Sequence, residues 1–176
     1  MSIKGSLIAA AVGAVLSTPL AYAADSGTDQ HFIREAIQGN LAEVKVGNLA
    51  EEKGASQGVK DFGATLAKDH AAANDKVKQV AQSAGVTPPT EPNAKQKAMY
   101  KELSALSGEQ FDRHFVQGMV KDHKEDIAKY EKEANGSGAA ADYAKQILPD
   151  LRKHLQTAQQ LQQQLRSASA GTSKMK

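Results

Sequence analysis

The placement of histidine is the feature of this sequence that can support chemistry. The chain of 176 residues contains five histidines and no cysteine. Three of the histidines, His70, His123 and His154, stand where Leu or Val is expected on the apolar stripe of three different helical segments. Imidazole is a common ligand of transition metals, whereas a buried imidazole without a partner costs free energy. These three residues are therefore the first candidates for a metal site.

One carboxylate belongs to the same set. Glu43 borders the apolar stripe of the first helical segment, among small side chains. Counted from the turn that joins their segments, Glu43 and His70 lie level to within about one helical turn. The same count places His123 level with His154 to within about one turn. The predicted metal ligands are thus Glu43, His70, His123 and His154.

The two remaining histidines serve as internal controls. His114 lies nine residues before His123, which is about 180° around a helix, so its ring is expected to face solvent. His31 falls in the first turn of the first segment, far from the other histidines in height. Neither is expected to bind a metal ion.

Four aspartates lie near the candidate histidines. Asp126 and Asp150 are close enough in angle to a histidine of their own segment to accept a hydrogen bond from its ring or to act as extra ligands. Asp69 and Asp122 each adjoin a histidine in sequence but point about 100° away from it. We expect these two at the surface.

An imidazole and carboxylate ligand set suits zinc, copper, iron or nickel, and the sequence does not choose among them. The function predicted first is therefore the binding of one divalent transition metal ion in a helical core. Because only neutral imidazole binds a metal, affinity should fall as the pH drops below about 6.5.

Two other functions fit the same residues. The histidines and Glu43 could satisfy one another as a polar core cluster, in a structural or stress-related envelope protein that acts through its surface. An enzyme is a third hypothesis, and it would need an open coordination position that solvent reaches. The nucleotide-binding, nucleophile-elbow and metalloprotease motifs are absent from the sequence.

The elements that position these residues are helices. Apolar residues form one stripe at helical spacing in each of four segments, which predicts amphipathic helices over about 28–53, 57–84, 108–134 and 139–165. Ser56 is expected to cap the second helix and Gly85 to end it. Two of the predicted connections, near 54–55 and 135–138, are short and rich in glycine. These short connections predict antiparallel helix pairs.

The middle connection is long. After the prolines that follow Gly85, residues 94–106 can form a short extra helix before Ser107 and Gly108 interrupt it. Connections in the order short, long, short are typical of ferritin-like bundles. The predicted fold is an all-α, ferritin-like four-helix bundle with a long crossover between the second and third bundle helices. A simple up-and-down bundle with an extra helix is the alternative.

The ends of the chain are expected to lie outside this domain. Residues 1–23 resemble a cleavable signal peptide, with Lys4 at its start, an apolar run and a small-residue cleavage site before Ala24. We therefore expect export to the periplasm, a helical domain over 24–166 and a disordered tail over 167–176. The apolar run is too short for a membrane anchor, so no membrane span is expected in the mature protein.

Charge limits the partners. The formal net charge is +2, and acidic and basic residues are interspersed along the chain. This pattern gives no electrostatic footprint for nucleic acid. The sequence indicates a metal ion as a partner and identifies no protein partner.

Several motifs resemble those of a known family. They are the runs Gly39-Asn40-Leu41-Ala42-Glu43-Val44, Lys68-Asp69-His70, Phe111-Asp112-Arg113 and Leu148-Pro149-Asp150-Leu151. Over about residues 28–165 the chain resembles an exported bacterial family of unknown function, number forty-one forty-two, whose members are often catalogued as outer-membrane proteins. The resemblance implies a ferritin-like fold, and the four predicted ligands match the family pattern. It implies no activity, but it is compatible with a periplasmic protein that associates peripherally with the outer membrane.

One feature distinguishes the chain from di-iron ferritins. Those proteins carry Glu-x-x-His on two helices. Here the residue three before His70 is Ala67, and the residue three before His154 is Leu151. A carboxylate-bridged di-iron oxidase centre is therefore not expected.

Overall fold

The computed structural model describes residues 26–173, and this part of the chain is helical without any strand. Its helices are α1 (Ser26–Lys53), α2 (Gln57–Ser83), α3 (Ala94–Ser104), α4 (Gly108–Ala134) and α5 (Ala139–Ser173). The prediction of an all-α chain is confirmed. The predicted signal peptide, residues 1–23, lies outside the described residues.

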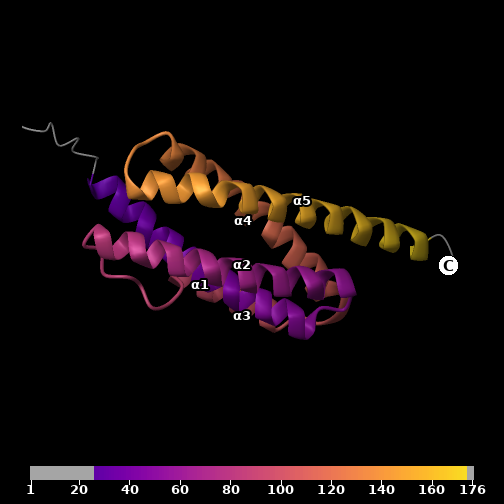
Figure 1. Ribbon diagram of the computed structural model, residues 1–176. Helices are drawn as coiled ribbons and strands as arrows, with labels where there is room; N and C mark the ends of the chain where they lie inside the picture. Colours follow the sequence, from indigo (N-terminus) through magenta and orange to yellow (C-terminus); the bar gives the residue numbers. More distant parts are fainter. Residues whose placement is uncertain (1–25, 174–176) are drawn as a thin grey trace, which may run out of the picture.

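The long helices pack as two hairpins that face each other (Figure 1). α1 packs mainly against α2, and α4 packs mainly against α5. The hairpins meet where α2 faces α5 and where α1 faces α4, while the short α3 lies against α1 and α4. Each long helix therefore presents one face to a shared interior.

Local sequence explains where the helices begin and end. Ser56 caps α2, and its hydroxyl oxygen accepts a hydrogen bond from the backbone N–H of Val59. Gly85, which follows α2, has a φ of +65°, a conformation that glycine adopts without strain. Asn93 and Gln96 form a reciprocal capping box at the start of α3. The predicted Ser56 cap and the predicted stop at Gly85 are both confirmed.

The turn between α1 and α2 is fixed to α4 by a buried carboxylate. Asp112, at the start of α4, accepts hydrogen bonds from the backbone N–H groups of Ala55 and Ser56, each at 2.8 Å. The side chain of Asp112 is only 1% exposed. Because charge-assisted bonds of this kind are strong, they hold the first hairpin at a defined height on the second.

The interior consists of two apolar clusters with a polar layer between them. One cluster surrounds Ile37, Val77 and Ile147, and the other surrounds Val46, Leu66 and Phe115. Buried polar residues of all four long helices lie between the two in sequence: Asn40, Glu43, His70, His123 and His154. Asn74, also buried, lies one turn after His70 at the edge of the first cluster. The polar layer is thus enclosed along the helix axes by packed apolar side chains.

The last helix is longer than the sequence predicted. α5 continues to Ser173, although residues 167–173 were expected to be disordered, and Figure 1 shows it running past the ends of the other helices. The hydroxyl group of Ser169 accepts a hydrogen bond from the guanidinium of Arg113 on α4 at 2.8 Å. This contact ties the extension to the bundle. Within residues 26–173, no helix has the length and apolar character that crossing a membrane requires.

Candidate metal centre

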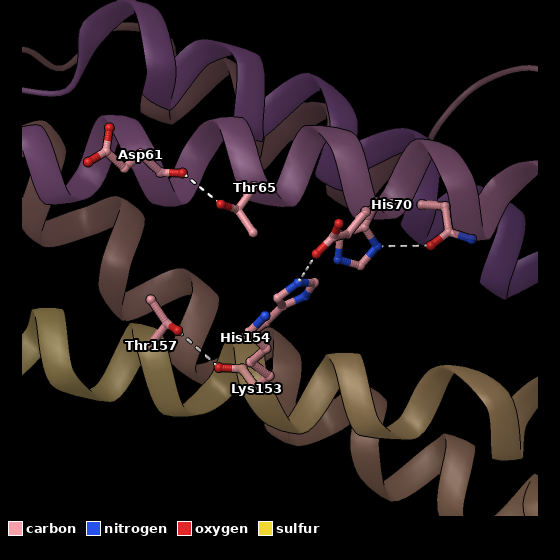
Figure 2. Close-up of polar contacts among 8 residues, drawn as sticks. Asp61, Thr65, His70, Lys153, His154 and Thr157 are labelled. Atoms are coloured by element: carbon pink, nitrogen blue, oxygen red, sulfur yellow. Dashed lines mark hydrogen bonds and ion pairs between the residues drawn. The ribbon is translucent and has the colours of Figure 1, made fainter.

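Three imidazole rings meet inside the polar layer. His70 on α2, His123 on α4 and His154 on α5 are 4%, 1% and 2% exposed. Their ring centroids are 5.4–5.8 Å apart, and one nitrogen of each ring lies within 4.8 Å of a nitrogen of the other two. Figure 2 shows His70 and His154 facing each other across the space between their helices. The predicted convergence of the three histidines is confirmed.

One nitrogen of each ring is hydrogen-bonded to a fixed acceptor. Nδ1 of His70 lies 2.9 Å from Oδ1 of Asn40, whose amide group donates to the hydroxyl oxygen of Tyr143. Nδ1 of His123 lies 3.0 Å from the backbone oxygen of Met119. Nε2 of His154 lies 2.9 Å from a carboxylate oxygen of Asp69. Since all three partners accept, each of these nitrogens carries the proton.

In each ring the hydrogen bond leaves one nitrogen, which carries no proton when the imidazole is neutral. These are Nε2 of His70, Nε2 of His123 and Nδ1 of His154, and none of them has a hydrogen-bond partner among the described residues. Each of the three atoms is an acceptor with a free lone pair. They therefore cannot hydrogen-bond to one another.

Burial keeps the imidazoles of His70 and His123 neutral. Removal from water lowers the pKa of His70 well below its ordinary value, and the neighbouring His123 and His154 lower it further. Burial, with a contribution from His154, lowers the pKa of His123 to about 4, although its bond to the Met119 carbonyl acts in the opposite direction. At neutral pH both rings are in the form that binds metal ions.

The ring spacing is close to that of a coordinated ion. Two nitrogen ligands of a tetrahedral zinc ion, each about 2.1 Å from the metal, are about 3.4 Å apart. The three nitrogens here lie within 4.8 Å of one another. A movement of roughly an ångström, which side-chain rotation can supply, would bring them to ligand distance.

Glu43 occupies a neighbouring position in the polar layer. It is not among the side chains whose ligand atoms lie within 4.8 Å of one another. It lines a cavity with Asp122 and Asp126, and its Oε2 is buried without a partner among the described residues. Burial raises the pKa of Glu43 well above its usual range, and the charges of Asp126 and Asp122 add to the effect.

The structure places the other predicted residues as follows. His31 and His114 are exposed, as expected of the two controls. Asp150 is exposed as well, and Asp126 lies at the cavity with Glu43, where burial raises its pKa to about 6. No hydrogen bond joins Asp126 to His123 among the described residues.

Asp69 was expected at the surface, and its side chain is 35% exposed, but it also contacts one of the candidate ligands. Asp69 binds His154 across the interface between α2 and α5. A residue about 100° around α2 from His70 leaves the centre of the bundle but still faces the next helix, so Asp69 can contact α5 while part of its side chain remains exposed. Asp122 is half-buried for the same geometric reason, at the side of α4 near α1 and α3.

Sequence reasoning about the site missed two buried amides. Asn40 fixes the tautomer of His70, and Asn74, one turn after His70 on α2, is 5% exposed with its Oδ1 unpartnered among the described residues. The available signal was their spacing: each lies three or four residues from a predicted ligand on its own helix.

Comparisons with known proteins support the helical fold and indicate no activity or ligand. The family model of a domain of unknown function (DUF4142) matches residues 15–161. No curated protein matches the chain. A crystal structure of a DUF305 fragment from Deinococcus radiodurans is similar with a TM-score of 0.69 and 15% sequence identity, covering 78% of this chain and 96% of that one. At this identity the likeness concerns the fold alone.

Proposed function

The chain belongs to the DUF4142 family of unknown function, and from its own site we propose that it binds one divalent transition metal ion through His70, His123 and His154. The bound metal is zinc, copper, iron or nickel, the ions that imidazole ligands suit. The three rings come from three helices of the bundle, so one ion would link both hairpins.

A single observation carries this proposal: the three buried rings approach one another to within 4.8 Å, nitrogen to nitrogen, and one nitrogen of each ring has no hydrogen-bond partner among residues 26–173. The rival, a polar cluster in which the histidines and Glu43 satisfy one another, requires a donor for each lone pair. A buried water molecule has two protons and can satisfy at most two of the three. A cation satisfies all three at once.

The outer partners of the rings support the same assignment. Asn40, the Met119 carbonyl and Asp69 each accept a proton from the nitrogen that faces away from the cluster. Partners of this kind fix the tautomer and orientation of metal-binding histidines. The carboxylate of Asp69 also strengthens His154 as a ligand, because it stabilises positive charge on the ring.

We propose Glu43 as the fourth ligand, as the sequence predicted. Its Oε2 is buried and without a partner among the described residues. A carboxylate oxygen with no hydrogen bond is stabilised by a cation. Rotation of the long side chain of Glu43 would bring this oxygen toward the histidines.

We also propose that the bundle is ferritin-like and that the protein is exported to the periplasm. Connections over residues 54–56, 84–107 and 135–138 follow the short, long, short order of ferritin-like bundles, which supports that classification. The signal-like residues 1–23 support export to the periplasm. Mass spectrometry of the protein from a periplasmic extract should find Ala24 at its start, and an uncleaved chain would contradict export.

Metal titration tests the proposed function. Apoprotein over residues 24–176 is titrated with Zn²⁺ and with Co²⁺, and bound metal is measured after gel filtration. We expect one equivalent of each ion, and for Co²⁺ the visible absorption of a nitrogen-ligated site. His123→Ala should lower the affinity at least ~100-fold, since one of three imidazole ligands is lost.

His114→Ala is the matched control, because it removes an exposed histidine from the same helix. It should bind as tightly as the wild type. A second ligand variant, His154→Gln, covers the case in which His123→Ala does not fold. If the wild type retains no stoichiometric metal and the histidine variants change only its melting temperature, the polar-cluster function is correct instead.

A further inference from the structure

A cavity rich in carboxylates lies between α1, α4 and the segment that contains α3. Its volume is about 180 Å³. Carboxylate groups outnumber ammonium groups in its lining by five to two. The carboxylates are Glu35, Glu43, Asp122, Glu125 and Asp126, and the ammonium groups are Lys95 and Lys129. An excess of negative charge in a hollow raises the local concentration of cations.

Glu43 gives an independent indication of a ligand at this cavity. The residue is only 6% exposed, yet its Oε2 has no hydrogen-bond partner among the described residues. A buried carboxylate is normally paired, because the loss of its hydration is otherwise uncompensated. Asp126 and Asp122 are the nearby charges that act on it, and both are negative. A cation is the group that would compensate all three.

The ion pairs already present at the cavity are weak enough for such a cation to replace them. Lys129 is the ammonium group nearest the carboxylates, with its Nζ 3.8 Å from Asp126 and 3.7 Å from Glu35. Both distances are long for a hydrogen-bonded pair, and half of the lysine side chain is exposed. Exposed pairs of this type contribute little free energy, so a divalent cation can displace the ammonium group.

The cavity leads toward the histidines. A second, smaller cavity shares part of the same lining, including Glu35, Asp126 and Lys129, and adds Asn40 and His70. Asp126 therefore faces both cavities, and His70 lines the inner one. The two cavities are therefore neighbours, one beside the carboxylates and one beside His70.

We infer that the outer cavity is the uptake site of the protein: Asp122, Asp126 and Glu43 capture a hydrated divalent cation and pass it to the histidines. The inference rests on the proposed function of the histidine site. Carboxylate oxygens accept cations that keep part of their water, whereas imidazoles bind dehydrated transition metals more tightly. Glu43 acts in both steps, first as a capturing ligand and then as the fourth ligand of the inner ion.

Stopped-flow mixing of apoprotein with Co²⁺ tests the inference, since the absorption of the nitrogen-ligated ion reports arrival at the histidines. Asp126→Asn should slow uptake at least ~10-fold, because the cation is no longer concentrated at the cavity. The equilibrium affinity for Co²⁺ should change less than ~3-fold, as the histidine ligands are intact. Asp122→Asn should slow uptake in the same way, which covers a folding failure of the first variant.

Asp75→Asn is the matched control. It removes the same charge from an exposed position on α2, where the side chain is 78% exposed and pairs only with Lys78. Its uptake rate should equal that of the wild type. Equal rates for the wild type and both cavity variants would overturn the uptake site and leave the histidine site standing. If the wild type develops no Co²⁺ absorption, the histidine site fails and the uptake site fails with it.

Discussion

At the scale of single residues, the direction of each hydrogen bond decides what the site can do. The three rings donate outward to Asn40, the Met119 carbonyl and Asp69, and turn their lone pairs inward. With the opposite tautomers the rings would present protons to one another and repel a cation. The acceptors that surround the cluster are therefore as important to the proposed function as the imidazoles themselves.

Asp69 allows a direct test of this outer layer. Asp69→Ala should weaken zinc binding about 10- to 100-fold, because the proton of His154 is no longer held on Nε2. Competition with a chromophoric chelator measures the change. Asp75→Ala, an exposed aspartate on the same helix, should leave the affinity unchanged. Equal affinities of the Asp69 variant and the wild type would show that the outer hydrogen bond does not orient the ligand.

The lowered pKa of His123 predicts the pH dependence of the apoprotein. The unfolded chain protonates this ring near pH 6.5 and the folded chain only near pH 4. Between these values the unfolded state binds more protons, so the free energy of unfolding falls as the pH falls. The loss from this group is about 2 kcal/mol at pH 5 relative to pH 7.5.

A variant isolates this contribution from other groups. Glu43 and Asp126 have raised pKa values, and they act in the opposite direction because the folded state protonates them more readily. Urea unfolding at pH 7.5 and 5 should therefore show that the wild type loses about 2 kcal/mol more than His123→Leu. The same pH dependence in both proteins would mean that His123 is not kept neutral by the fold.

The sequence predicted the positions of the histidines but not their partners. The alternation of three and four showed which residues face inward on each helix. It could not show that Asp69 reaches a ring on α5, because that contact depends on how α2 and α5 rotate against each other. The sequence did not identify Asn40 and Asn74 as buried for a similar reason: an amide at the edge of an apolar stripe is as common at the surface as in the interior.

At the scale of elements, close packing of α1 on α2 sets the distance between the helices that carry Glu43 and His70. A Cβ atom built on Gly63 would lie 2.6 Å from the backbone oxygen of Gly47 and 2.8 Å from the Cβ of Ala50. Two helices can approach this closely only where side chains are absent. Both glycines lie between the capped turn at Ser56 and the polar layer, so they set the spacing of the hairpin.

Gly63→Ala tests the role of this crossing. It should lower the free energy of unfolding by about 1–3 kcal/mol, since the backbone of α1 must move away. Gly118→Ala is the matched control on α4: a Cβ atom there meets nothing within 4 Å, so alanine should stabilise the helix by up to about 1 kcal/mol. Urea unfolding measures both. A stabilising Gly63→Ala would mean that the helices are not in tight contact.

At the scale of the whole molecule, the polar layer lies where both hairpins meet. The histidines come from α2, α4 and α5, and Glu43 comes from α1. Two apolar clusters enclose the layer from above and below along the helices. The bundle is thus stabilised by two ordinary cores and carries between them a layer that is not optimised for the stability of the apoprotein.

The C-terminal end of α5 could not be predicted from the pattern of apolar residues. The apolar stripe ends at Leu165, and the small, polar residues that follow were expected to be disordered. The helix continues past Leu165, and Arg113 of α4 donates a hydrogen bond to the hydroxyl oxygen of Ser169 in this extension. Single polar contacts of this kind leave no periodic signal in the sequence.

X-ray absorption at the zinc edge of the zinc-loaded protein tests the central claim most directly. Three imidazole ligands at about 2.0–2.1 Å and one oxygen ligand are the predicted first coordination sphere. His154→Gln should lose one imidazole contribution, and His114→Ala should lose none. A spectrum with fewer than two imidazoles, or one that His154→Gln leaves unchanged, would contradict the account.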